Sequence, residues 1–467
     1  MSCYDRIILA LASLINRKYG QHQTIVAVHA KTLEAARYKL RTAKGISALE
    51  YSHCPAFPLY GSGQGAGNSP SIWLFISSTL FDLHDEQAHG ASFSTPDGTQ
   101  QVRLTMVGFV DDSTGTCNDF QPTGECSLDT LAQRMQHDAQ LWNDLLFCSG
   151  GRLELGKCSF HVLHFRFKAD GTPVPLLKSF DHDISVRDSI TGDRIPIPAK
   201  HSTEAHKTLG HYKAPADRYQ KQQLYALTST AKRLSILLST SPINRAGSKL
   251  AYHSIYASAV GYALPQSFFT KAQLDKAQGQ SMASIIAKCG YTRTTASALI
   301  YAPTELGGAG FISWYSLQGV GQVQLFLKHW RTNSLISKVL RIDVAWSQWQ
   351  AGFGHSILEA PKVSLPWLEC RWLSSLRDFL AHCNGRIHLD HSFVVQPERD
   401  GDIFIMEYAQ QSRLFTTAEL RFINYCRLYL HITTVSELFN AAGTAMLPHM
   451  FQCRPSPWRR PDHFITR

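Results

Sequence analysis

Two adjacent carboxylates are the residues of this sequence best suited to chemistry. Asp111 and Asp112 follow the apolar run 106–110 and precede two small polar residues. Neighbouring acids at a turn repel each other, so they do little for stability by themselves. They become useful where divalent cations lie between carboxylates and phosphates, because paired metals hold the attacking and leaving oxygens of an in-line displacement. The alternative is that Asp111 and Asp112 are ordinary solvated turn residues.

The pattern around the pair predicts the elements that position it. Apolar residues before and after a short polar stretch are typical of a β-hairpin, so we expect Asp111 and Asp112 at its tight turn. A helix is expected over 128–147, where apolar residues recur at helical spacing and Gly150-Gly151 follows. A second helix is expected over the apolar run 72–83.

A glycine-rich segment precedes that second helix. It has four glycines in seven positions, from Gly61 to Gly67, and Ser69-Pro70 follows as a helix start. Glycine lets the backbone approach a ligand closely, and a helix N-terminus suits a phosphate or a base. No Gly-Lys-Ser/Thr sequence follows, so this is not a P-loop. A helix entry without a ligand is the open alternative.

Basic residues gather in the middle of the chain. Lys157 is expected at the centre of a turn and strand over 153–160, although a single lysine is usually just solvated. Three helices are expected over 219–238, 246–264 and 272–287. Their basic residues are Lys221, Lys232, Arg233, Arg245, Lys249, Lys271 and Lys276. Such helices suit a nucleic-acid backbone, or they are ordinary solvated faces.

The composition of the chain excludes several classes of protein. Of the 467 residues, 44% are hydrophobic and 18% charged, as in ordinary globular proteins, and the net charge of +10 favours an anionic partner. The eleven cysteines lack paired spacing, which indicates reduced thiols rather than a disulfide framework or zinc finger. With no signal-peptide pattern and no membrane-length apolar run, we expect an intracellular protein of the nucleus or cytoplasm, not a secreted one and with no membrane partner.

The order of the motifs resembles the palm of reverse transcriptases, and most closely that of non-LTR (LINE-like) retrotransposons. The matching segments, in chain order, are Gly63-Gln64-Gly65 to Ser69-Pro70, Phe109 to Asp112, Gly151 to Cys158, Leu209-Gly210, and the turn Gly307 to Phe311. The resemblance covers residues 1–328 and implies an α+β fold. It implies an incomplete right-hand palm, an antiparallel sheet with helices, over 1–215 and a helical thumb over 216–320. A mostly helical region of unassigned role follows over 321–467.

The resemblance also implies roles for individual residues. Asp111, Asp112 and Lys157 would be catalytic: the two acids would bind Mg²⁺ (or Mn²⁺), and Lys157 would approach the incoming triphosphate. Substrate binding would fall to Tyr4, which would screen the sugar 2′ position, and to Gln64, Gly65 and Ser69. Leu209 and Gly210 would belong to the primer grip. The partners would be an RNA template, a DNA primer and dNTPs. Tyr4 favours deoxynucleotides, which argues against an RNA-dependent RNA polymerase.

The sequence departs from this family at its start. The aspartate of the first palm motif would fall two residues before Met1, and the fingers would precede it. The resemblance therefore implies an N-terminally truncated domain that is nearly inactive as written, since the remaining acids cannot supply the same ligand set. Two alternatives stay open: a catalytically inactive palm–thumb that only binds nucleic acid, and a retroelement relic without function.

Overall fold

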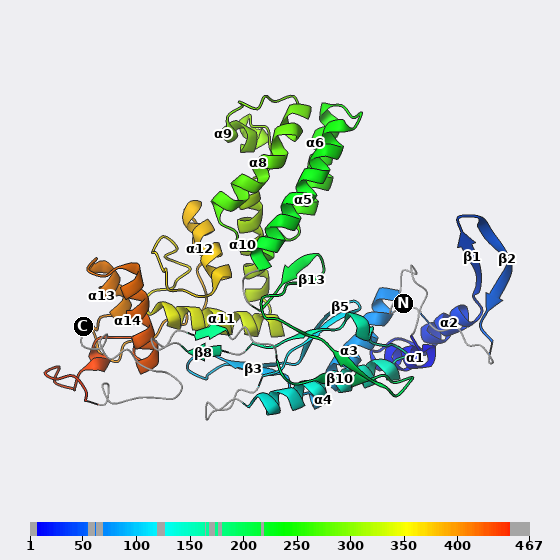
Figure 1. Cartoon of the computed structure of the whole chain (residues 1–467), viewed down its shortest axis with the longest axis horizontal. Helices are drawn as coiled ribbons and strands as arrows, with labels where there is room; N and C mark the ends of the chain where they lie inside the picture. Colours follow the sequence, from blue (N-terminus) through cyan, green and yellow to red (C-terminus); the bar gives the residue numbers. More distant parts are fainter. Residues whose placement is uncertain are drawn as a thin grey trace. The chain divides into compact units, whose positions relative to one another are not determined.

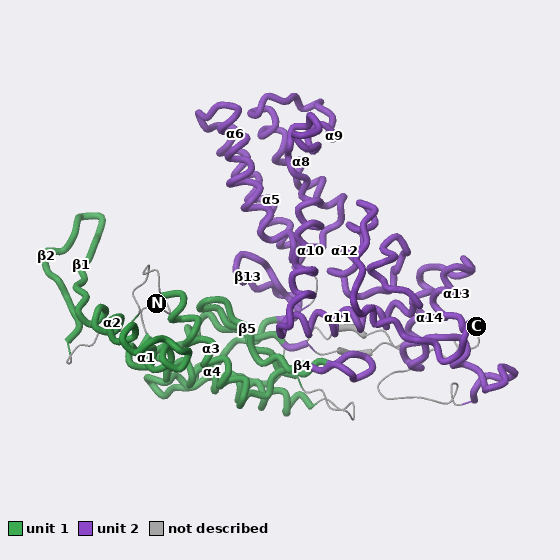
Figure 2. Tube along the Cα trace, turned by 180° about the vertical axis from the view of Figure 1, so that it is seen from behind, with its two compact units in different colours: residues 1–93, 102–161, 179–200 green, residues 94–101, 162–178, 201–467 purple. Residues whose placement is uncertain are grey.

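The computed structural model describes residues 7–54, 61, 69–118, 127–163, 165–167, 173–175, 180–215 and 219–448 (Figure 1). It divides into two compact units, coloured separately in Figure 2. Unit 1 comprises residues 1–93, 102–161 and 179–200, and unit 2 comprises residues 94–101, 162–178 and 201–467. The predicted divisions at 215 and 320 stay predictions, because compact units need not coincide with functional domains.

The chain mixes helices with small sheets, as the α+β prediction requires. The elements up to residue 200 are α1 (Leu9–Lys18), α2 (Gln23–Glu34), β1 (Arg37–Thr42), β2 (Gly45–Ser52), α3 (Ser69–Gln87), β3 (Ala91–Ser94), β4 (Gln101–Leu104), β5 (Met106–Phe109), β6 (Asp112–Gly115), α4 (Leu128–Cys148), η2 (Leu155–Lys157), β7 (Phe160–His161), β8 (Phe165–Phe167), β9 (Pro173–Pro175), β10 (Ile184–Arg187), β11 (Arg194–Ile197) and β12 (Ala199–Lys200).

Unit 2 continues with two short strands and then helices. These are β13 (His206–Thr208), β14 (His211–Lys213), α5 (Tyr219–Thr240), α6 (Arg245–Ala251), η3 (Tyr252–Ala257), α7 (Ser258–Gly261), η4 (Leu264–Gln266), α8 (Lys271–Lys288), α9 (Ser297–Tyr301), η5 (Thr304–Leu306), α10 (Trp314–Trp330), α11 (Leu335–Ala351), α12 (Arg371–His382), α13 (Ile405–Gln411), α14 (Thr417–Leu430) and η6 (Ser436–Leu438).

The core of unit 1 forms between α1, α3 and α4. Ile72, Ile76 and Leu80 recur every four residues on α3, so they form one apolar stripe, and all three are buried. They pack with Ile15 of α1 and Trp142 of α4. Each such side chain stabilises the fold by about 1.5–3 kcal/mol relative to an exposed one. This packing fixes the two helices, α3 and α4, that hold the Asp111–Asp112 hairpin.

The helix α4 also binds the edge of a strand. Gln136, Gln140 and Asn143 lie on one face of α4 because their spacing is four and three residues. The Gln136 and Gln140 side-chain oxygens accept hydrogen bonds from the Ser185 and Arg187 amides of β10, at 2.9 and 2.8 Å. Asn143 donates to the Arg187 carbonyl at 3.1 Å. Side chains of α4 thus occupy the edge that another strand would otherwise pair with.

The described strands pair two by two in small sheets, and these pairs do not join into the antiparallel palm sheet that the resemblance implies. Six of the described pairs join strands that follow each other directly in the chain, such as β5 with β6 and β10 with β11, whereas β7 pairs in parallel with β12. One physical reason is that α4 side chains bind the backbone of β10 at the edge away from β11, so no further described strand pairs with β10 there. The mixture of helix and strand is confirmed, whereas a palm–thumb arrangement is not.

Several segments differ from what their local patterns indicate. The apolar residues of 24–29 suggest a short buried segment and those of 33–40 a helix, but residues 23–34 form the mostly exposed α2 and residues 37–42 form β1. The turn to β2 uses Gly45 at φ +126°, which other residues rarely adopt. Of the turn and strand expected over 153–160, the turn is the single-turn helix η2, which Lys157 ends, and the strand β7 begins only at Phe160. The pattern of residues 207–212 suggests one short strand, whereas the chain turns back at Leu209-Gly210 to form the hairpin β13–β14.

Three helices of unit 2 confirm the predicted helices after Pro215. Helices α5 and α8 lie side by side, as Figure 1 shows. Helix α6 runs through the π-helical turn η3 into α7, and Tyr252 and Tyr256 of that turn are fully buried and stacked, with ring centroids 5.3 Å apart. A second apolar cluster joins α10 to α14 around Leu373 and Met406. None of the described helices is both long and apolar enough to cross a membrane.

Candidate functional site at the Asp111–Asp112 hairpin

The predicted hairpin is present, and the two carboxylates lie at its tip. Phe109 pairs with Asp112 across the strands β5 and β6, so only Val110 and Asp111 make the turn. Asp111 is therefore the second turn residue and Asp112 the first residue of β6. Both are exposed. The sequence prediction for this pair is confirmed as to its position, and its metal-binding role stays a prediction.

The turn holds a β-branched residue in a left-handed conformation. Val110 has φ +57°, a region that valine rarely adopts. The indole N–H of Trp73 on α3 donates to the Val110 carbonyl at 2.6 Å, and this hydrogen bond holds the turn to α3. Strained backbone of this kind costs about 1–3 kcal/mol and clusters at functional sites, where the surrounding structure determines it. The conformation of Val110 is therefore a pointer to function that is independent of the two acids.

One face of the hairpin is fitted onto two helices. Gly108 and Ser113 are opposite each other in the register. A Cβ on Gly108 would lie 2.3 Å from Cζ of Phe81 on α3, so only glycine fits there. The Phe81 ring stacks on Trp142 of α4 with 5.2 Å between centroids, and the Trp142 indole N–H donates to the Ser113 hydroxyl at 3.0 Å. Both helices thus hold the strands that present Asp111 and Asp112.

The opposite face of the hairpin is open. Because side chains alternate along a strand, Val107 and Phe109 point away from α3 and α4. Their exposed fractions are 44% and 60%. Two carboxylates on a fixed turn, beside an exposed apolar strand face, could hold a hard divalent cation through oxygen atoms.

The helix α3 connects a second predicted residue to this turn. Ser69 is the first residue of α3 and is buried, and Trp73 lies one helical turn further on. Lys157, exposed at the end of η2, has no described hydrogen bond or ion pair with Asp111 or Asp112. Three further predicted residues, Tyr4, Gln64 and Gly65, lie outside the described residues.

Leu209 and Gly210 form the tip of another hairpin, in unit 2. Both turn residues have positive φ, +51° and +83°, which is the pattern of the tight turns that suit hairpins. A Cβ on Gly210 would lie 3.4 Å from Cε1 of Tyr262. The Tyr212 amide donates to the Gln223 side chain of α5 at 2.8 Å. Like Val110, Leu209 is a bulky residue in a strained turn that a neighbouring element supports.

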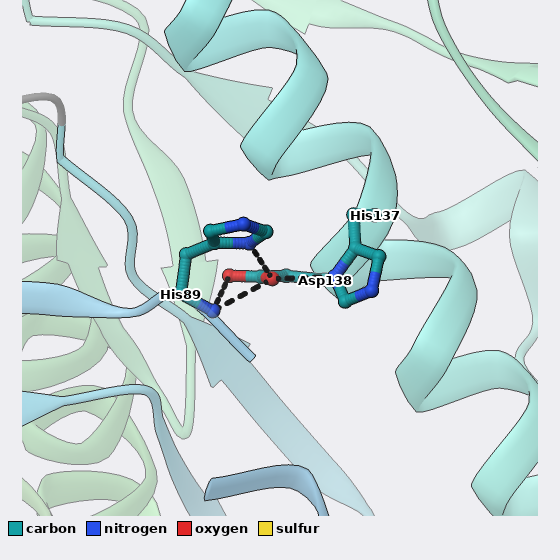
Figure 3. Close-up of side chains that lie close together, drawn as sticks. All are labelled: His89, His137 and Asp138. Atoms are coloured by element: carbon teal, nitrogen blue, oxygen red, sulfur yellow. Dashed lines mark hydrogen bonds and ion pairs between the residues drawn. The ribbon is translucent and has the colours of Figure 1, made fainter. Parts of the chain in front are cut away.

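Another group of side chains lies beside the hairpin's helices and has no signal in the sequence. His89 follows α3, whereas His137 and Asp138 lie within α4 (Figure 3). Nδ1 of His89 lies 2.9 Å from Oδ1 of Asp138, and Nδ1 of His137 lies 3.2 Å from the same oxygen. Asp138 has an exposed side-chain fraction of only 12%. Because 48 residues separate His89 from His137, no local spacing in the sequence reveals the group.

Backbone groups hold the Asp138 carboxylate in place. The His89 amide donates to both carboxylate oxygens, at 2.9 and 3.1 Å, and the Gly90 amide donates to Oδ2 at 3.2 Å. Burial alone would raise the pKa of the Asp138 carboxyl, but these hydrogen bonds and those to the two imidazoles outweigh it, so the pKa lies below its usual value. Asp138 is therefore a charged, fixed carboxylate.

Comparison with known proteins assigns no family. No protein-family model matches the sequence, and no curated protein is significantly similar to it. The resemblance to reverse transcriptases accordingly depends on the quoted motifs alone.

Proposed function

We propose that this protein carries part of a reverse transcriptase-type nucleotidyltransferase, with Asp111 and Asp112 as ligands of Mg²⁺ or Mn²⁺. The observation that supports it best is the Asp111–Asp112 turn itself. Two exposed carboxylates follow a strained Val110, and two helices fix that turn through Gly108, Trp73 and Trp142. A two-residue hairpin turn requires a positive φ at its first residue, and it is the valine at this position, in place of the usual glycine or asparagine, that supports a functional turn.

In this proposal the reaction is the attack of a primer 3′-hydroxyl on the α-phosphate of a dNTP. Positioning and neutralisation of phosphate charge supply most of the rate enhancement of such transfers. Asp111 and Asp112 would hold the cations, which when bound would supply that neutralisation. The RNA template, the DNA primer and the dNTP remain the proposed partners, with Lys157 near the triphosphate and Leu209-Gly210 at the primer.

Primer extension with Mg²⁺, an RNA template and a DNA primer tests the assignment. We expect slow incorporation of dNTPs, because the resemblance assigns only two metal-binding carboxylates within residues 1–467. Asp111→Asn should lower it by a factor of about 100 or more, since metal stabilisation of the transition state is worth several kcal/mol. Asp82→Asn, an exposed carboxylate on α3, is the matched control and should change little. Incorporation that survives Asp111→Asn would show that the site is wrongly assigned.

The second candidate function is nucleic-acid binding without synthesis. Residues 219–320 contain nine Lys or Arg and two acidic residues, a net charge of +7 out of +10 for the whole chain. Lys232 and Arg233 of α5 and Lys276 of α8 are exposed. A surface of this charge binds phosphate backbones through counterion release. Binding that depends steeply on salt, together with no Mg²⁺-dependent synthesis, would favour this candidate.

A further inference from the structure

We propose that His89, His137 and Asp138 form a binding site for a divalent transition metal, with Zn²⁺ the expected ion. Nothing in this inference depends on the proposed polymerase function. The three ligand atoms all lie within 4.8 Å of one another (Figure 3). Ligand atoms of one tetrahedral zinc stand about 3.3 Å apart, as bond lengths of about 2.0–2.1 Å require. The two His–Asp distances, 2.9 and 3.2 Å, already match that spacing.

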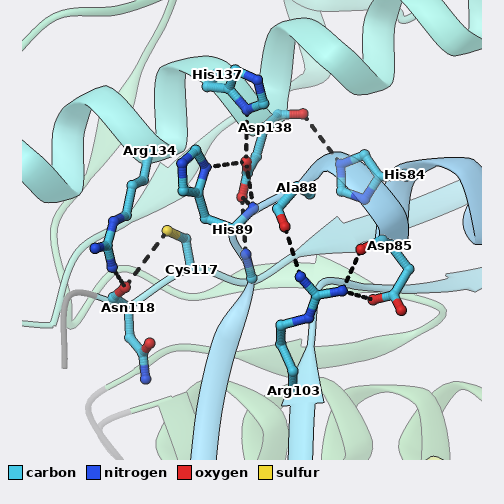
Figure 4. Close-up of polar contacts among 11 residues, drawn as sticks. His84, Asp85, Ala88, His89, Arg103, Cys117, Asn118, Arg134, His137 and Asp138 are labelled. Atoms are coloured by element: carbon cyan, nitrogen blue, oxygen red, sulfur yellow. Dashed lines mark hydrogen bonds and ion pairs between the residues drawn. The ribbon is translucent and has the colours of Figure 1, made fainter. Parts of the chain in front are cut away.

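The carboxylate is preorganised for this role. The His89 and Gly90 amides fix Asp138 whether or not the imidazoles contact it. Helix α4 is itself held at this position, because the buried His84 of α3 donates through Nε2 to the Asp138 carbonyl at 3.3 Å (Figure 4). A metal would thus meet one ligand that needs no reordering, which favours binding.

The two imidazoles are accessible. The His89 and His137 side chains have exposed fractions of 42% and 52%, so an ion and a completing water can reach their nitrogens. The rings meet edge to face with centroids 5.0 Å apart. Because both Nδ1 atoms already lie against the same Asp138 oxygen, ring rotations would turn them toward one ion, which would replace the two hydrogen bonds to Asp138.

The donor set selects the kind of ion. Two imidazoles and one carboxylate suit Zn²⁺, Co²⁺ or Ni²⁺, whereas Mg²⁺ prefers oxygen ligands only. The site is thus chemically distinct from Asp111 and Asp112, which offer only oxygens. Its effect would be structural, because the ion would link the segment after α3 to the middle of α4, the two helices that support the hairpin.

A Zn²⁺ titration of the full chain against a chromophoric competing chelator tests the site. We expect the wild type to bind one tight equivalent at micromolar Zn²⁺. His137→Ala and His89→Ala should each weaken it by more than about tenfold, the scale of loss even for residues that only support ligands. Asp138 is left unchanged, because its loss would also free the His89 and Gly90 amides. His137→Gln repeats the test with a side chain of similar size.

The control is His388→Ala. His388 is an exposed histidine with a carboxylate partner, its Nδ1 lying 3.1 Å from Oε1 of Glu359, but it has no described second imidazole beside it. This variant should bind zinc as the wild type does. The spectrum of the Co²⁺ form should lack a thiolate charge-transfer band, which separates the site from the cysteines. Equal zinc affinity in His137→Ala and wild type, or no tight equivalent in the wild type, would overturn the proposal.

Discussion

At the scale of single residues, the Asp111–Asp112 turn depends on partners that are distant in the sequence. The sequence placed both acids at a hairpin turn correctly, because the apolar frame around them is local. It could not reveal Val110 at φ +57° or its bond from Trp73, since the two residues are 37 positions apart. The need for glycine at 108 likewise comes from Phe81, which lies on another element.

Gly108→Ala should destabilise the protein by about 1–3 kcal/mol, because the added methyl group meets the Phe81 ring and overpacks the contact between β5 and α3. Urea denaturation followed by tryptophan fluorescence measures the loss. Gly115→Ala is the matched control on the same hairpin, where the nearest atom to a new Cβ is 3.8 Å away. Adding Phe81→Leu to Gly108→Ala should recover part of the loss. Equal stability of the two alanine variants would contradict the packing described here.

At the scale of elements, periodic helices were predictable and short strands were not. The apolar residues of α3, α4 and α5 recur at helical spacing, which is a local pattern. Each of these helices begins and ends within a few residues of its predicted bounds. Residues 33–40 show a similar apolar pattern, but pairing with β2 turns their second half into β1, with Tyr38 stacked on Tyr51 at 5.6 Å between centroids. Pairing between strands is a tertiary effect that overrides local propensity. The His89–Asp138 group was missed for the same reason.

The β13–β14 hairpin carries a titratable group whose burial should make stability depend on pH. His211 is buried, with its Nε2 3.4 Å from the Ser267 hydroxyl. Burial, reinforced by the positive charge of Lys213, lowers the pKa of His211 from 6.5 to about 4. The unfolded chain therefore takes up a proton first as pH falls. Stability from this group is complete above pH 6.5 and is lost progressively down to pH 4.

The loss should amount to at most about 3 kcal/mol between pH 7 and pH 4, given about 1.4 kcal/mol per pKa unit. Urea midpoints at both pH values measure it. His211→Gln should flatten this part of the pH dependence, whereas His391→Gln, an exposed histidine, should not. An NMR titration in which the His211 ring protonates near its ordinary pKa would contradict the assignment.

At the scale of the whole molecule, charge is distributed unevenly along the chain. Residues 219–320 hold most of the positive excess, and the helices α5, α6 and α8 expose much of it in unit 2. Composition indicated an anionic partner, and the helices that display the charge were also predictable. Which of these side chains remain available could not be read from the sequence, because Lys271 pairs with Asp275 at 2.6 Å and Lys288 donates to the Ser241 carbonyl at 2.8 Å.

Lys232→Glu with Arg233→Glu should therefore weaken binding of a primer–template duplex, and it should lower the slope of log K against log salt by about 2, one for each phosphate contact. Fluorescence anisotropy over a salt series measures both quantities. Lys362→Glu with Arg399→Glu changes the net charge equally but lies outside residues 219–320, at exposed positions. If only overall charge attracts nucleic acid, both pairs weaken binding alike. If α5 instead carries a specific binding surface, only Lys232→Glu with Arg233→Glu should lose much affinity and show the reduced salt slope. The reason is that only Lys232 and Arg233 would then displace counterions from the bound phosphates.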